Sequence, residues 1–178
     1  DRETVQLNPA SDYRVDVAEF QALHTACQGH RHRRVERCLP CMRRLERMAE
    51  LYHGEFLEHF FVGDSTLFEE WATLKREWLH REAIEALFIL TDYYTRHGEL
   101  TRARQCARRQ VELEPWREEA HRQLMRLLAL EGQRSAALAQ YEACRRILAQ
   151  ELGVEPMAET TALFEAIKRE EIQAQPEH

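Results

Sequence analysis

Two stretches of the chain follow the same pattern 34 residues apart. Gly98 opens the first stretch and Gly132 opens the second. In each, an alanine follows five residues later, as Ala103 or Ala137, and apolar residues at helical spacing then lead to a proline. The glycine permits a sharp reversal between two helices, and the small alanine lets the second helix approach the first. Since one such pair cannot bury its apolar face alone, successive pairs must stack.

This period predicts the fold class. A helix-turn-helix unit of about 34 residues is typical of tetratricopeptide repeats, so we expect an all-α fold of tetratricopeptide-like antiparallel helix pairs. The second unit departs from the pattern, because a proline expected near Ala149 arrives only at Pro156. The alternative is an ordinary helical bundle in which the repeated spacing is accidental.

Apolar residues at helical spacing predict where the helices lie. The first helix should begin near Asp16 and carry Ala26 or Cys27 on its apolar face. A longer pattern starts at Thr66, and it is one helix or two helices that meet near His80. Four shorter helices should follow, at 101–113, 116–131, 134–151 and 159–172.

Two details of these helices are also predicted. Thr66 and Glu69 have the spacing of a capping box at the start of the long pattern. Trp71 and Trp78 fall on one helical stripe, so we expect both in the core, rather than in a ligand-stacking site with Trp116.

The N-terminal segment does not fit the helical pattern. Residues 4–7 and 13–17 are β-branched runs, and turn-forming residues separate them. They predict a short N-terminal β-hairpin remnant, which is either a small hairpin or the last strands of a further domain. Because the first residue is not Met, we expect the sequence to be part of a larger protein.

Composition and charge exclude several classes of protein. No apolar run approaches the roughly 18 residues of a membrane span, and no signal peptide opens the sequence. The formal net charge of −6 argues against a dominant nucleic-acid surface. The five cysteines are expected to be reduced thiols, so we place the protein in the cytoplasm. No G-x-S-x-G, phosphate-binding glycine loop or H-E-x-x-H is present, and we expect no enzyme activity.

One cluster of residues has the chemistry of a metal site. Its members could together bind zinc: His30, His32, Cys38 and Cys41. The two pairs are close in sequence, however, and Pro40 lies within the second. We therefore favour a basic connector that carries two thiols, and we expect no bound metal and no cofactor. A redox C-x-x-C is disfavoured, because no βαβ pattern surrounds it.

Several motifs resemble one family. The stretches "LYHGEFLEHF", "FEEWATLKREWL" and "YEACRRILAQELGVEP" resemble the bacterial transcriptional activator domain, a helical module of antibiotic-regulatory-type transcriptional regulators. The resemblance covers roughly residues 14–168. In that family a winged-helix DNA-binding domain lies immediately upstream. The resemblance therefore implies that residues 1–17 end such a domain, that 18–172 form the helical domain, and that 173–178 are a frayed tail.

The resemblance also implies a function. We expect a regulatory protein-interaction module that couples the DNA-binding domain to self-association, to RNA polymerase or to a downstream signalling domain. DNA would be contacted only through the upstream domain, and no membrane is involved. If the 34-residue register holds, the first helix of each pair presents a partner-binding groove with these residues: Glu85, Asp92, Arg96, Glu119, Arg122 and Arg126. The alternative is a free-standing tetratricopeptide-type scaffold or adaptor without a DNA-linked role.

Overall fold

The structure is a computed structural model that describes residues 14–31, 34–60, 62 and 65–172. Within these residues the chain forms seven α-helices, one short 3-10 helix and no strand. The helices are α1 (Asp16–Gln28), α2 (Leu39–Leu51), α3 (Thr66–Arg96), α4 (Leu100–Leu113), α5 (Glu118–Leu130), α6 (Arg134–Glu151) and α7 (Ala158–Lys168), and the 3-10 helix η1 is Val35–Arg37. The all-α prediction is confirmed.

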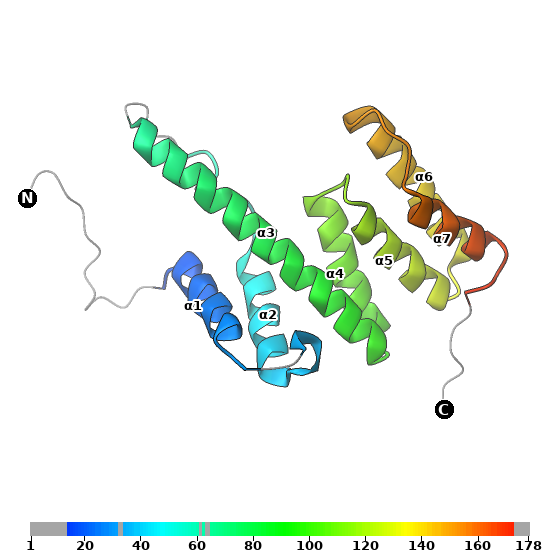
Figure 1. Cartoon of the computed structure of the whole chain (residues 1–178), viewed down its shortest axis with the longest axis horizontal. Coiled ribbons are helices and arrows are strands. Elements are labelled where there is room, and N and C mark those ends of the chain that lie inside the picture. The colour runs from blue at the N-terminus through cyan, green and yellow to red at the C-terminus, as the bar shows by residue number, and fades with distance from the viewer. Residues whose placement is uncertain (1–13, 32–33, 61, 63–64, 173–178) are drawn as a thin grey trace, which may run out of the picture.

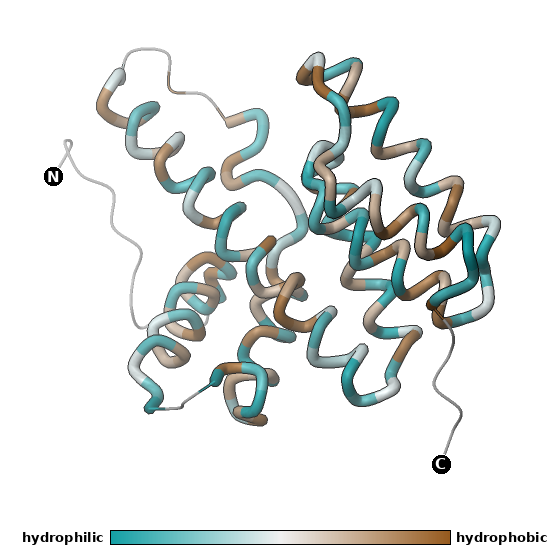
Figure 2. The backbone as a smooth tube through the Cα atoms, turned by 45° about the vertical axis from the view of Figure 1, so that its right-hand side comes forward, coloured by the Kyte–Doolittle hydropathy of each residue, from teal (hydrophilic) through white to brown (hydrophobic). Residues whose placement is uncertain are grey.

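Each α-helix packs against the next in the chain, and α5 also contacts α3 and α7. Figure 1 shows the long helix α3 running across the molecule, with α1 and α2 beside it and α4 to α7 stacked beyond it. The tube in Figure 2 alternates between hydrophilic and hydrophobic colours along the helices, as expected of helices with one buried face. Large, fully buried apolar side chains come from α1 and α2 as well as from α3, α5 and α6: Phe20, Met42, Met48, Ile84, Leu90, Met125, Leu127 and Leu148.

The repeated glycines form the same turn twice. Gly98 and Gly132 both have φ of +73°, a backbone conformation that glycine adopts freely and other residues resist. Beyond each glycine, a backbone N–H bonds to the carbonyl five residues earlier, from Glu99 to Tyr94 (2.9 Å) and from Gln133 to Leu128 (2.8 Å). Both helix ends are therefore Schellman turns.

The alanines also take their expected places. Ala103 and Ala137 are fully buried, on the helices that follow the two turns. The 34-residue repeat predicted from the sequence is thus a structural repeat.

The long pattern is one helix, since no glycine or proline interrupts it between Thr66 and Arg96. Its cap lies one residue earlier than predicted. Ser65 is the N-cap, and its hydroxyl accepts a hydrogen bond from the backbone N–H of Phe68 (3.3 Å). Glu69 instead accepts from the N–H of Val62 (3.1 Å), so the Thr66–Glu69 capping box does not form.

The predictions for the two ends of the chain fall mostly on residues that the structure does not describe. The predicted hairpin falls mainly on residues 1–13, outside the described residues, and Asp16 and Val17 of its predicted second strand belong to α1. The tail 173–178 also lies outside them. The last helix ends at Lys168 rather than at residue 172.

Candidate partner groove and His–Cys cluster

A groove of about 220 Å³ runs between α3 and α5, the first helices of two successive pairs. We name it the α3–α5 groove. The groove-lining residues that bear on its chemistry are Phe88, Asp92, Thr95, Glu119, Arg122 and Arg126. Facing helices of neighbouring pairs bring these side chains together from positions about 30 residues apart.

The charges in the α3–α5 groove are of both signs. Asp92 pairs with Arg96 one turn along α3 (2.8 Å), and Glu119 pairs with Arg122 on α5 (3.4 Å). Arg126 is exposed and makes no ion pair with any residue that the structure describes. It is the cation of the groove that a partner can reach without displacing a bound carboxylate.

A buried amide supports the α3–α5 groove from behind. The side chain of Gln110 on α4 donates to the hydroxyl of Thr91 (3.0 Å) and to the amide oxygen of Gln123 (2.9 Å). Gln123 in turn donates to the backbone carbonyl of Phe88 (3.3 Å). Side chains of α3, α4 and α5 are thus joined by directional bonds, which hold the two walls of the groove at one spacing.

Arg122 has a structural task as well. The buried carboxylate of Glu118 accepts hydrogen bonds from the Thr160 hydroxyl (2.5 Å) and from the backbone N–H of Met157 (2.8 Å) at the start of α7. Arg122 donates to the same Thr160 hydroxyl (2.8 Å). We call Glu118, Arg122 and Thr160 the α5–α7 network, because it ties the N-terminus of α7 to α5.

The structure places the six predicted groove residues in different surroundings. Four of them line the α3–α5 groove: Asp92, Glu119, Arg122 and Arg126. Arg96 adjoins it through its ion pair with Asp92. Glu85 lies about two helical turns before Asp92 on α3. It lines a separate hollow of about 240 Å³ against α1 and α2. Different neighbours cover the same face of α3 along its length, which the repeat register alone does not reveal.

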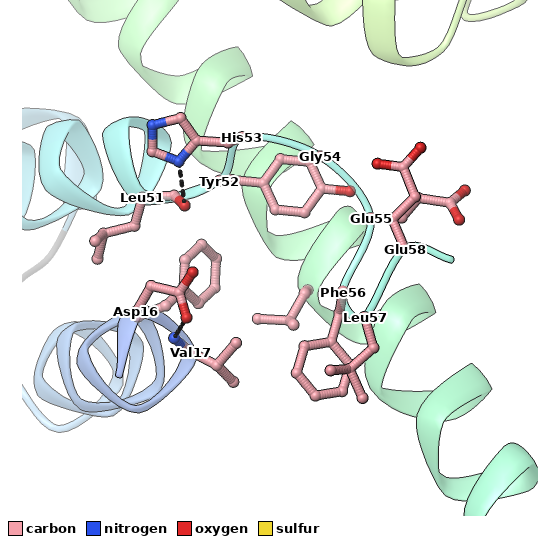
Figure 3. Close-up of a pocket in the computed structure, with 12 residues that line it drawn as sticks. Asp16, Val17, Leu51, Tyr52, His53, Gly54, Glu55, Phe56, Leu57 and Glu58 are labelled. Carbon is pink, nitrogen blue, oxygen red and sulfur yellow. Dashed lines mark hydrogen bonds between the residues drawn. The ribbon is translucent and has the colours of Figure 1, made fainter. Parts of the chain in front are cut away.

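The largest of these pockets, about 380 Å³, lies between the start of α1, the end of α2 and the connector after α2 (Figure 3). Asp16 and Val17 border it from α1, and the segment 51–58 closes the other side. Carboxylates of Glu55 and Glu58 lie at its rim, and His53 is the only basic side chain among the described residues that line it. We assign it no function.

One end of this pocket connects to a chain of hydrogen bonds. The Tyr52 hydroxyl bonds to Nδ1 of His80 (3.0 Å), whose Nε2 donates to the carboxylate of Glu114 (3.0 Å). Burial raises the pKa of the Tyr52 hydroxyl. The chain links α2 through α3 to the residues between α4 and α5. Sequence reasoning missed it, although His80 and Glu114 are one 34-residue period apart.

The first turns of α3 carry a largely exposed apolar stripe, although the ring of Phe56 packs edge-on against Trp71 (5.6 Å between ring centroids). Leu67, Trp71 and Leu74 are 80%, 50% and 68% exposed. The prediction that Trp71 is a core residue is therefore wrong, whereas Trp78 packs against the core as predicted. The covered face of α3 at this level contains the fully buried Ala72 instead, and Arg76 on α3 donates to the backbone carbonyls of Phe56 and Leu57 in the connector after α2.

The predicted metal-site residues are brought together only in part. The ligand atoms of His30, Cys38 and Cys41 lie within 4.8 Å of one another. His32 lies outside the described residues. The same corner contains Cys27, which the sequence pattern offered, with Ala26 as the alternative, for the apolar face of α1.

Comparison with known proteins defines the class. The model of the bacterial transcriptional activator domain family matches residues 15–168, and the chain belongs to this family. A solved structure of Mycobacterium tuberculosis EmbR, in complex with a low-affinity phosphopeptide, is similar in fold and 25% identical in sequence, with a TM-score of 0.59. The similarity covers 92% of this chain but 39% of the EmbR chain, so this chain spans about two fifths of that protein's length. No curated protein sequence matches the chain.

Among the described helices, none is both long enough and apolar enough to cross a membrane.

Proposed function

We propose that this domain is a protein-interaction module of a bacterial transcriptional regulator, and that it couples an upstream DNA-binding domain to a protein partner. The partner is a second copy of the regulator, RNA polymerase or another domain of the same chain. Such a module acts by binding rather than by catalysis, in the cytoplasm where the chromosome lies. The observation that carries the proposal is the match of the family model to residues 15–168, which span all seven α-helices.

The α3–α5 groove is the surface we propose for this contact. It lies on the first helices of two stacked pairs, where repeat proteins of this kind form extended binding surfaces. Asp92, Glu119 and Arg126 offer charges of both signs within one groove, which suits a partner segment that carries both signs as well. Arg96 and Arg122 would act by fixing the two carboxylates.

Phosphopeptide binding is not part of the proposal. EmbR was solved with a phosphopeptide, but most of the EmbR chain lies outside the similarity. Phosphate recognition in proteins favours clusters of free arginines. At the α3–α5 groove, Arg96 and Arg122 are already paired with carboxylates.

The test uses a charge reversal at the groove. Sedimentation of the chain measures self-association, and biolayer interferometry measures binding to purified bacterial RNA polymerase. We expect Arg126→Glu to weaken one of these associations by about tenfold or more. Arg108→Glu is the matched control, since Arg108 is also exposed but lies on α4, away from the groove.

One result would contradict the proposed groove contact, and a second would narrow the choice of partner. Equal loss in Arg126→Glu and Arg108→Glu would show a general charge effect and no groove contact. Absence of both associations would leave only contacts within the parent chain, which cross-linking of the intact regulator then tests. A scaffold without a DNA-linked role is the alternative, and it requires that no DNA-binding domain shares the chain.

A further inference from the structure

The joint between α1 and α2 brings four ligand side chains into one corner. Cys27 lies in the last turn of α1, and His30 follows two residues after its end. Cys38 is the N-cap of α2, and Cys41 lies in its first turn. The sequence is thus C-x2-H-x7-C-x2-C, in which each pair sits at one helix end. The reversal between the two packed helices brings the pairs together.

The distances suit tetrahedral zinc. Nδ1 of His30 is 3.2 Å from the sulfur of Cys38 and 3.3 Å from the sulfur of Cys41. With Zn–S bonds of about 2.3 Å and Zn–N bonds of about 2.0 Å, a tetrahedral ion separates such atoms by about 3.5 Å. The nitrogen of His30 is therefore within a few tenths of an ångström of the separations from these two sulfurs that the ion requires. The ligand atoms of His30, Cys38 and Cys41 all lie within 4.8 Å of one another, and they would draw together around the ion.

Cys27 provides the fourth ligand and the third sulfur. Its thiol donates a weak hydrogen bond to the backbone carbonyl of Cys41 (3.9 Å). Sulfurs gathered in one corner repel one another as thiolates, and a divalent cation removes that repulsion.

The surroundings complete such a site. The Arg44 guanidinium donates to the carbonyl of Ala26 (3.1 Å) and lies 3.9 Å from the sulfur of Cys41. Its positive charge offsets the net negative charge of three thiolates and one Zn²⁺. Pro40 lies between Cys38 and Cys41, and it argued against a metal site in the sequence. It occupies the first turn of α2, where no backbone N–H is needed.

A redox dithiol fits this corner less well. A C-x-x-C dithiol uses two cysteines only, whereas Cys27 and the ring of His30 also lie at this corner. A purely apolar role does not explain the position of His30, whose ring lies against both sulfurs although the residue is exposed.

We propose that the joint between α1 and α2 binds one structural Zn²⁺ through four side chains: Cys27, His30, Cys38 and Cys41. This reverses the expectation from sequence that no metal is bound. Only Phe20 and Cys27 of α1 are buried, so the ion would add a firm attachment of α1 to the rest of the domain. The inference is independent of the proposed partner groove.

The first test is metal content. The chain, purified under reducing conditions without chelator, should contain about one zinc per molecule by inductively coupled plasma mass spectrometry. We expect Cys38→Ser and His30→Ala to lower that content by about tenfold or more. Cys106→Ser is the matched control, since Cys106 is also partly buried but lies on α4, and it should retain zinc.

The second test reports the ligands directly. Cobalt(II) added to the metal-free chain should give the absorption bands of tetrahedral coordination with thiolate ligands, and Cys27→Ser should weaken the thiolate charge-transfer band. Circular dichroism separates loss of metal from loss of fold, and because His30 is exposed, His30→Ala is expected to keep its helices.

Three results would overturn the proposal. They are zinc content near zero in the wild-type chain with and without added Zn²⁺, zinc retained in His30→Ala and Cys38→Ser alike, and a Cys38–Cys41 disulfide found by mass spectrometry in freshly reduced protein. Full zinc retention with an unchanged cobalt spectrum in Cys27→Ser would overturn the assignment of the fourth ligand.

Discussion

His121 is a buried imidazole at the contact between α5 and α6. Its Nε2 donates to the backbone carbonyl of Pro115 (2.8 Å), and its Nδ1 accepts from the side-chain amide of Gln140 (2.7 Å). These bonds use both nitrogens of the neutral ring. Burial lowers the pKa of His121 below its ordinary value, in spite of the bond to the carbonyl.

This shift has a consequence for stability. Since the pKa is lower in the folded chain, the unfolded chain takes up the proton first as the pH falls. The free energy of unfolding should therefore be highest above about pH 6.5 and decline below it, until the folded ring is itself protonated. Urea denaturation between about pH 7.5 and about pH 5.5 measures this slope.

Substitution isolates the contribution of one histidine. His121→Gln should flatten the slope, whatever its effect on absolute stability. His53→Gln, at an exposed position, should leave the slope unchanged. Parallel slopes for all three proteins would assign the pH dependence to other groups.

Thr160 in the α5–α7 network allows a second prediction about a single residue. Thr160→Val keeps the shape of the side chain but removes the hydroxyl that joins Arg122 to Glu118. Leaving buried polar groups short of a partner costs about 1–3 kcal/mol of unfolding free energy. Thr101→Val on the exposed surface of α4 should change it by less than about 0.5 kcal/mol. Equal melting temperatures for the two variants would show that the network adds no stability.

The two Schellman turns are the feature of the helix pairs that substitution tests most directly. A Cβ at Gly98 or Gly132 would meet no atom within 4 Å, so only the positive φ opposes a side chain. Gly98→Ala and Gly132→Ala should each cost about 1 kcal/mol. Gly54→Ala is the control, because Gly54 has no positive φ and its Cβ would make ordinary contact with Glu58 (3.5 Å). A cost confined to one of the repeated glycines would contradict their equivalence.

Helices were predictable where local signals decide them. Gly98 and Gly132 fix two turns, and α4 and α6 were predicted to within one residue of their observed bounds. The exposure of Trp71 was not predictable, because the large apolar side chains marked one face of α3, whereas the face that the chain covers there contains the small Ala72.

The candidate sites required tertiary contacts. In the sequence alone, Cys27 has the position of an apolar helix residue. Only the return of the chain at α2 places it beside Cys41. Likewise, Asp92 and Arg126 line one groove, as the repeat register groups them, but Glu85 faces α1 and α2, whose position the repeat does not encode.

The charge of the whole molecule determines its expected behaviour with DNA. The net charge is −6, so long-range attraction to phosphates is absent. We expect the 178-residue chain to bind a fluorescent DNA duplex weakly or not at all at physiological salt, as measured by anisotropy. Tight binding to one duplex and not to a scrambled duplex of equal length would show that the helical domain itself reads sequence.

Because α3 packs against helices on both of its sides, it limits where recombination can divide this domain. Its 31 residues extend about 46 Å, and it packs against α2 as well as against α4 and α5. Repeat proteins commonly gain or lose whole helix pairs, but a recombination joint at either end of α3 would strip one set of neighbours from Leu79, Ala83 and Leu87, which are buried. Natural fusions and engineered chimeras should therefore inherit α1 to α4 as one block, and variation in length should occur only beyond α4.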